Sequence, residues 1–108
     1  MKRKPDPDLQ TASASMQALA RSLAALSRPD QVRAFLEDLC TPAELEAMAD
    51  RWRVVPLLLK GVPYREIHEL TQVSVTTIGR VARTLETGTG GYAIAAAGHK
   101  IRSSNASH

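Results

Sequence analysis

The sequence contains one cysteine, Cys40, among its 108 residues. An internal disulfide is therefore excluded, and this cysteine usage is typical of a protein from a reducing compartment. Aromatic residues make up only 4% of the chain, with a single Trp and a single Phe. Few large side chains are available to fill a core, and a chain of this length buries a modest share of its surface on folding. We therefore expect a second copy of the chain to contribute to stability.

Long apolar runs are also absent. No stretch approaches the roughly 20 apolar residues that span a bilayer, and the N-terminal MKRKPDPDLQ is followed by Thr, Ala and Ser rather than by the apolar segment of a signal peptide. The sequence predicts a cytoplasmic protein with no membrane partner.

The residue sets that carry catalysis or bind metals are missing as well. No Ser, Cys or His stands at the spacing of a nucleophile and its base. The GTGG of residues 88–91 follows a predicted helix instead of joining a strand to a helix, so it is not a phosphate-binding loop. His68 lies far from the other histidines, His99 and His108. We predict no enzymatic activity, no catalytic residues and no metal site.

The charge is mildly basic, with a net charge of +3 and a pI of about 9.4. This excess suits a polyanionic partner, but many basic proteins bind no nucleic acid. Residues 1–8 are highly charged and contain two prolines, which predicts a flexible basic arm. Its lysines and arginine are either phosphate contacts or merely solvated.

Apolar residues at helical spacing predict an all-α domain over residues 9–97. A first helical pattern covers residues 9–26, and a second begins near Pro29. The third is the best defined, because Thr41 and Glu44 form a capping box around Pro42, and Gly61 is a helix stop.

This third helix, residues 42–60, is apolar around much of its girth, which is typical of a helix buried on more than one side. In so short a chain the second side is expected to face another subunit. Pro56 interrupts the helix at a cost of about 3 kcal/mol. We expect a kink there rather than a break, since the apolar spacing continues.

Residues 64–85, YREIHELTQVSVTTIGRVARTL, predict two short helices joined by a tight turn. Residues 71–74 interrupt the helical rhythm, and Ser74 is a good N-cap for the second helix. Such a corner leaves the start of the second helix free to enter a DNA major groove, which is about 12 Å wide. The residues expected to form the core between these helices are Ile67, Leu70, Val73, Ile78, Val81 and Leu85.

After the second of these helices the composition changes. The ETGTGG of residues 86–91 predicts a flexible stretch, and residues 92–97 allow one further turn of helix. Residues 98–108 are small, polar and basic, which predicts a disordered tail.

The segments LCTPAELEAMADRWRVVPLLLKG and YREIHELTQVSVTTIGRVARTL, followed by GGY, resemble the tryptophan repressor superfamily, and most closely its YerC/YecD-like branch. The resemblance covers roughly residues 35–92. It implies an intertwined all-α homodimer whose two helix-turn-helix heads face successive major grooves of a double-stranded DNA operator.

The resemblance also implies a ligand site. In members that respond to a corepressor, the indole of L-tryptophan lies between two arginines. Arg51 and Arg80 fall at those positions, and Thr41 falls near the ligand's amino group. A guanidinium plane can stack on an aromatic ring and pair with a carboxylate. The alternative is that both arginines are surface or phosphate-contacting residues.

Two positions depart from the tryptophan-binding pattern. Val81 stands where those members have a small residue, and Thr84 replaces their ligand-side serine. The extra bulk of valine in a tight pocket costs about 1 kcal/mol or more by overpacking. L-tryptophan is therefore one candidate effector, and another small corepressor, or none, is the alternative.

On DNA, the exposed start of the second corner helix would meet base edges, while the first helix would lie along phosphates. Few strong hydrogen-bond donors face the bases, so we expect DNA shape and water to carry much of the discrimination. The predicted base-facing residues are Val75, Thr76 and Gly79. The predicted residues near phosphates or flanking bases are Tyr64, Arg65, His68, Thr77 and Arg83.

These observations predict a sequence-specific DNA-binding transcription regulator, acting as a dimeric repressor that blocks a promoter by occupancy. A small ligand such as L-tryptophan is the candidate effector. The alternative is a helix-turn-helix used as a protein-interaction module without DNA binding.

Overall fold

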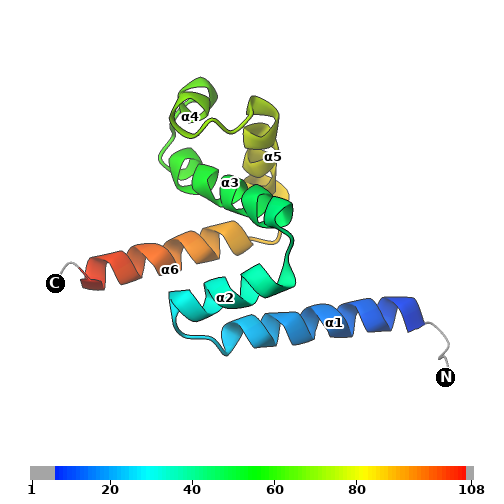
Figure 1. The fold of residues 1–108 in the computed structure, drawn as a ribbon. Coiled ribbons are helices and arrows are strands. Elements are labelled where there is room, and N and C mark those ends of the chain that lie inside the picture. The colour runs from blue at the N-terminus through cyan, green and yellow to red at the C-terminus, as the bar shows by residue number, and fades with distance from the viewer. Residues whose placement is uncertain (1–6, 107–108) are drawn as a thin grey trace. The chain divides into compact units, whose positions relative to one another are not determined.

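The computed structural model describes the backbone of residues 7–106 and the side chains of residues 11–98. This part of the chain consists of six helices without a strand (Figure 1), so the all-α prediction is confirmed. It divides into two compact units, Met1–Thr41 and Pro42–His108. The helices are α1 (Pro7–Ala24), α2 (Pro29–Leu39), α3 (Pro42–Leu59), α4 (Tyr64–Thr71), α5 (Val75–Thr87) and α6 (Gly91–Ala106).

The first unit contains α1 and α2. Helix α2 begins at Pro29, as its sequence predicts, and ends with Cys40 as its C-cap. No side chain between residues 11 and 41 is fully buried, and Met16 is 62% exposed. Of the predicted arm, residues 1–6 lie outside the described residues, and residues 7 and 8 already belong to α1. The apolar stripes of this unit thus stay partly open to solvent.

Helix α3 opens the second unit at Pro42 and continues through Pro56 to Leu59 as one helix. Its C-terminus confirms the predicted stop. Gly61 has a φ of 81°, a conformation that glycine adopts without strain. The Gly61 N–H donates to the Leu58 carbonyl and the Val62 N–H to the Leu57 carbonyl, each at 3.0 Å. These two bonds form a Schellman motif, which caps the last carbonyls of the helix.

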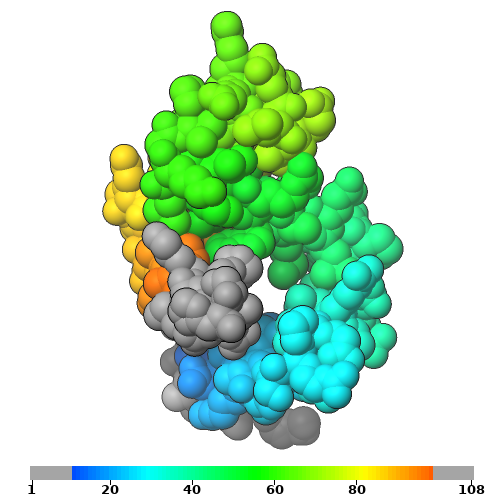
Figure 2. Space-filling view, turned by 90° about the vertical axis from the view of Figure 1, so that its left-hand side faces the viewer, coloured from blue at the N-terminus to red at the C-terminus, as the bar shows by residue number. Residues whose placement is uncertain are grey.

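The core of the second unit lies where α3, α4 and α5 meet, and α6 packs against α3 as well. In Figure 1, α4 and α5 lie on one side of α3 and α6 on the other. The space-filling view shows α3, α4 and α5 closed against one another (Figure 2). The buried apolar side chains are Val54, Val55, Ile67, Val73, Ile78 and Val81, with Leu85, Tyr92 and Ala96 among those packed around them.

The prediction that Leu70 joins this core is wrong, because its side chain is 61% exposed. The inward face of α4 is defined by Ile67 and Thr71, which are 0% and 8% exposed. Successive helical residues are about 100° apart, so Leu70 is turned away from a core that receives Thr71. The polar residue takes the inward position because its hydroxyl is bonded there, as described below.

Helix α6 differs from the expected boundary at residue 97, since its backbone stays helical to Ala106. Tyr92 and Ala96, one turn apart, pack against the core of the unit, which anchors its first turns. Among the described residues, no helix is both long and apolar enough to cross a membrane.

Candidate nucleic-acid interface

The turn between α4 and α5 contains only Gln72, Val73 and Ser74. Gln72 caps α4 in the left-handed region, with φ 66° and ψ 11°. Its backbone N–H donates to the His68 carbonyl at 2.7 Å, and its side-chain Nε2 donates to the Glu69 carbonyl at 3.1 Å. Two carbonyls at the end of α4 are therefore satisfied by one residue, which stops the helix sharply.

Two side chains of α4, Thr71 and His68, make hydrogen-bond contacts with the backbone of this turn. The buried Thr71 hydroxyl donates to the Ile67 carbonyl at 2.7 Å and accepts from the Val73 N–H at 3.1 Å. His68 Nδ1 lies 2.7 Å from the Val73 carbonyl oxygen. A carbonyl can only accept, so this nitrogen carries a proton. Both backbone polar groups of Val73 are thus bonded by side chains.

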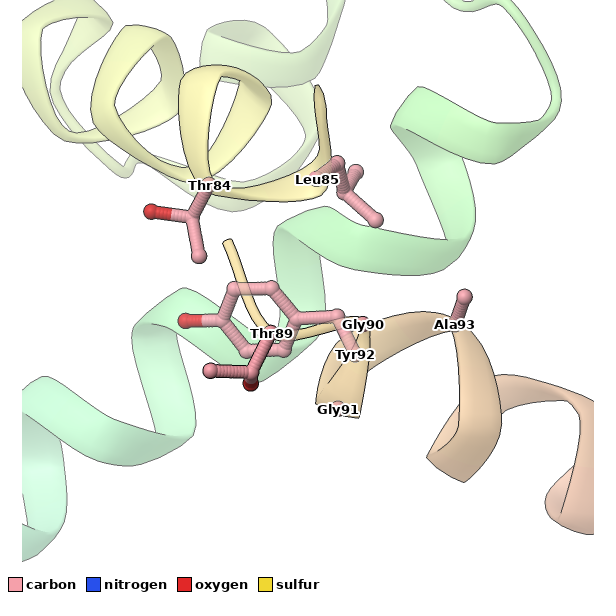
Figure 3. Close-up of a pocket in the computed structure, with 7 residues that line it drawn as sticks. All are labelled: Thr84, Leu85, Thr89, Gly90, Gly91, Tyr92 and Ala93. Atoms are coloured by element: carbon pink, nitrogen blue, oxygen red, sulfur yellow. The ribbon is translucent and has the colours of Figure 1, made fainter. Parts of the chain in front are cut away.

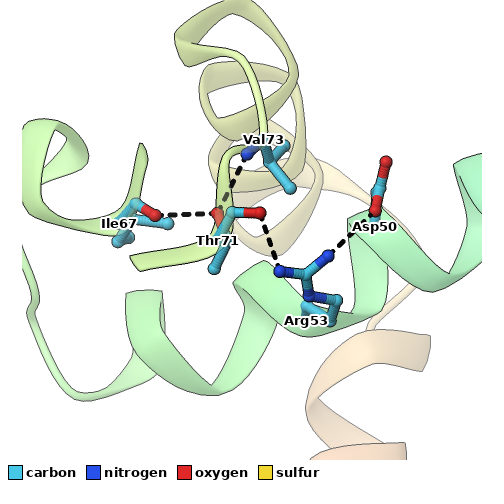
Figure 4. A network of polar contacts seen from close by, with 5 residues as sticks. All are labelled: Asp50, Arg53, Ile67, Thr71 and Val73. Carbon is cyan, nitrogen blue, oxygen red and sulfur yellow. Dashed lines mark hydrogen bonds and ion pairs between the residues drawn. The ribbon is translucent and has the colours of Figure 1, made fainter. Parts of the chain in front are cut away.

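Arg53 reaches the same turn from α3 (Figure 4). Its Nη2 donates to the Thr71 carbonyl at 2.7 Å, and its Nη1 donates to Asp50 Oδ1 at 3.2 Å. A cation next to the C-terminal carbonyls of a helix is favourable, because the helix dipole is negative there. Arg53 and Thr71 are 18 residues apart in sequence, so no local pattern indicated this contact.

Helix α5 starts as predicted, with Ser74 as its N-cap. The Ser74 Oγ accepts from the Thr77 N–H at 3.1 Å and also lies 3.1 Å from the Thr77 hydroxyl. Ile78 and Val81 face the core at 0% and 1% exposure, whereas Thr76 and Arg83 on the opposite side of the helix are exposed. Val75, the first residue of α5, is 51% exposed. The core contacts of Ile78 and Val81 therefore hold α5 in place, with its first turn facing outward.

Side chains of both corner helices lie beside Gly79. A Cβ on Gly79 would lie 3.7 Å from Arg83 Nη1 and 3.9 Å from Tyr64 Cε2. The Tyr64 ring of α4 and the Arg83 guanidinium of α5 thus flank the same half-buried glycine. Three predicted site residues, which belong to two helices, are neighbours.

The remaining predicted DNA-contacting residues are distributed over the same corner. Arg65, Thr76 and His68 are exposed, and Thr77 is half-buried. Because Nδ1 of His68 is bonded to Val73, only Nε2 is left for an outside partner. The hydroxyl of Thr77 is likewise in contact with Ser74.

The predicted ligand residues lie on several elements. Arg51 is half-buried on α3, and Thr41 is the last residue of the first unit. Arg80 and Thr84 lie one turn apart on α5, where the Thr84 hydroxyl donates to the Arg80 carbonyl at 3.1 Å. The structure brings Arg80 and Thr84 together through this helical turn.

A hollow of about 300 Å³ lies between the end of α5 and the start of α6. In Figure 3 the Thr84 side chain points toward the Tyr92 ring across this space. The hollow is lined by Thr84, Leu85, Thr89, Gly90, Gly91, Tyr92 and Ala93. Of the predicted ligand residues only Thr84 contributes, so this hollow differs from the arginine site that the resemblance implies.

Steric constraints explain why glycines stand in the connection between α5 and α6. A Cβ on Gly88 would lie 2.6 Å from the Thr84 carbonyl oxygen and 2.9 Å from Thr84 Cγ2, which leaves no room for a side chain. Gly90 has a φ of 88°. These glycines allow the chain to leave α5 and enter α6 within three residues.

Two comparisons with known proteins identify relatives of this chain. A family model described as Trp repressor protein matches residues 14–99. The chain is also similar to the uncharacterized protein YerC of Bacillus subtilis (strain 168), with 35% identity over 77 residues, which are 71% of this chain and 74% of that relative.

Proposed function

Because the chain belongs to the Trp repressor protein family, we propose that it is a sequence-specific DNA-binding transcription regulator. The observation that carries this proposal is the outward first turn of α5, which has a side-chain N-cap and is anchored by the buried Ile78 and Val81. A rigid helix end of this kind can enter the major groove, while the preceding helix crosses the backbone. The α4–α5 corner is then a helix-turn-helix.

In this arrangement α5 reads the bases and α4 positions the protein. Val75 and the Thr76 methyl group are small enough to contact a thymine methyl, and the Thr76 hydroxyl can bond a base edge directly or through water. Arg65 and Arg83 supply positive charge for phosphates. Helix α5 carries no acidic residue before Glu86, so its groove-facing part does not repel the duplex.

We further propose that the regulator is a homodimer that represses by occupying a promoter. Large apolar side chains remain exposed on every described helix of the single chain. Outside α4 and α5 they include Met16 on α1, Leu39 on α2, Met48 on α3 and Ile94 on α6, at 62, 50, 40 and 73% exposure. A second copy that covers such side chains also supplies the second DNA-reading head.

The effector of this regulator is proposed to be a small molecule such as L-tryptophan, held by Arg51 and Arg80 with Thr41 and Thr84. Isothermal titration calorimetry of the purified protein with L-tryptophan tests this directly. Heat that saturates with ligand, and that is lost in Arg80→Ala, supports the assignment. No heat at millimolar ligand excludes L-tryptophan.

The DNA-binding proposal predicts different effects for two substitutions on the corner. Arg65→Ala weakens binding to every duplex, because a phosphate contact carries no sequence information. Thr76→Ala instead changes which bases are preferred, by about 1 kcal/mol at one position. Selection from a random DNA pool, followed by fluorescence anisotropy on the enriched duplexes, measures both. Equal, sequence-independent losses in the two variants would remove Thr76 from the base-reading set.

Salt dependence separates this function from a protein-interaction module. Each neutralised phosphate contributes about −0.9 to the slope of log affinity against log salt. The wild-type protein is expected to show a slope several times −0.9. For Arg65→Ala the slope should be less steep by about 0.9, because one phosphate contact is lost. Absence of DNA binding at low ionic strength would favour the interaction module.

A further inference from the structure

We propose that Arg53 is a positioning residue for the DNA-reading helix, acting through the α4–α5 turn rather than through contact with DNA. The inference rests on the proposed DNA-binding function and adds a residue on α3 to it. Its basis is the bond from Arg53 Nη2 to the Thr71 carbonyl at 2.7 Å, which ties α3 to the last residue of α4 (Figure 4).

The position of this bond explains its effect on α5. Thr71 is the last residue of α4, and Val75, the first residue of α5, follows after three connecting residues. A displacement of the Thr71 carbonyl is transmitted through so short a turn to the first turn of α5. The groove-facing residues Val75 and Thr76 would move with it, and their fit to base edges depends on ångström-scale placement.

The Arg53 side chain is 49% exposed, so a phosphate contact is the alternative role that the salt slope tests. Its Nη2 is bonded to the Thr71 carbonyl and its Nη1 to the Asp50 carboxylate. Asp50 also compensates the positive charge. The planar guanidinium makes both bonds at once, whereas the single ammonium group of a lysine does not reproduce this fork.

Thr71 provides an independent route to the same turn. Its hydroxyl donates to the Ile67 carbonyl at 2.7 Å and accepts from the Val73 N–H at 3.1 Å. Thr71 is only 8% exposed. Thr71→Val keeps the shape and removes both bonds, while Thr71→Ser keeps the hydroxyl. If the turn sets base discrimination, Thr71→Val and Arg53→Lys should have the same effect.

The experiment compares two affinities for each variant: for a duplex that the wild-type chain enriches from a random pool, and for a shuffled duplex of the same length and composition. Loss of folded protein lowers both apparent affinities by one factor and leaves their ratio unchanged. A positioning role lowers the ratio itself. For Arg53→Lys and Thr71→Val we expect this ratio to fall on the order of tenfold, which is about 1.4 kcal/mol of discrimination.

Matched controls and the salt slope complete the test. Arg33→Lys makes the same change in the α2 ion pair with Glu37, and together with Thr71→Ser it is expected to preserve the ratio. Arg53→Met should keep the wild-type salt slope. A slope that is less steep by about 0.9 would identify a phosphate contact and overturn the proposal. An unchanged ratio in Arg53→Lys and Thr71→Val would also overturn it. A wild-type chain that enriches no duplex would instead refute the DNA-binding function.

Discussion

Gly79 shows at the scale of a single residue how stability and function can be separated. It lies inside α5, where glycine costs about 1 kcal/mol relative to alanine, and a Cβ there would make only ordinary contacts with Tyr64 and Arg83. A glycine at this position is therefore not required by the packing of the chain. Under the proposed function it leaves space for the approaching duplex.

We predict that Gly79→Ala raises the free energy of unfolding by about 1 kcal/mol and lowers DNA affinity severalfold. Urea unfolding and fluorescence anisotropy measure the two effects. Thr87→Ala, at the opposite end of α5, serves as the control and should leave DNA affinity unchanged. A Gly79→Ala protein that binds DNA as tightly as the wild type would remove Gly79 from the interface.

The inward residues of the corner were only partly predictable from sequence. Hydrophobic spacing identified Ile67, Ile78 and Val81 correctly, because each lies on a clear apolar stripe. It failed at Leu70, since a helix of eight residues offers two similar faces and the hydroxyl network of Thr71 decides between them. The contact of Arg53 with Thr71 depends on how α3 packs against α4, which no local pattern records.

At the scale of elements, the N-cap of α5 links folding to the proposed DNA contact. We predict that Ser74→Ala lowers the free energy of unfolding by about 0.5–2 kcal/mol, because the Thr77 N–H loses its acceptor. Ser74→Asp keeps an acceptor and adds a favourable charge at the helix N-terminus, so stability should be retained.

The same pair of variants tests the orientation of α5. A carboxylate at position 74 would face the phosphates of a bound duplex, so Ser74→Asp should bind DNA far more weakly than its stability suggests. Urea unfolding gives the first quantity and anisotropy titration the second. Unimpaired DNA binding by Ser74→Asp would mean that the start of α5 does not approach the duplex.

Helix ends were predictable where local chemistry defines them. Pro42, Gly61 and Ser74 stand at the starts or ends of helices in the structure, as their side chains or backbone freedom imply. Helix α6 was not predicted in full. Its first residue is Gly91, and its anchoring residues Tyr92 and Ala96 are held by contacts with other helices, which composition does not indicate.

At the scale of the whole molecule, the prediction concerns assembly. Ile94 is 73% exposed in the single chain, so in a monomer its substitution should change stability by no more than about 0.5 kcal/mol. In a homodimer that buries it, Ile94→Ser weakens association, whereas Ile94→Leu, with the same volume, preserves it.

Sedimentation equilibrium over a range of concentrations distinguishes the two cases. The wild-type protein is expected at twice the chain mass of 11.7 kDa, and Ile94→Ser at a lower average mass in dilute solution. A wild-type mass of 11.7 kDa at every concentration would exclude the homodimer. The family and the all-α fold could be recognised from sequence, and the resemblance implies a homodimer. The residues of its interface could not be predicted, because they depend on how two chains pack.

The short turn between α4 and α5 has a mechanical consequence for any effector. Three residues, held by the bonds of Thr71, His68 and Gln72, leave the two helices little freedom to tilt against each other, so they should swing as one rigid body. The buried core that they share with α3, and the bond from Arg53 to the Thr71 carbonyl, tie that body to α3 as well. A small molecule that switches DNA binding would therefore have to reorient α3, α4 and α5 together.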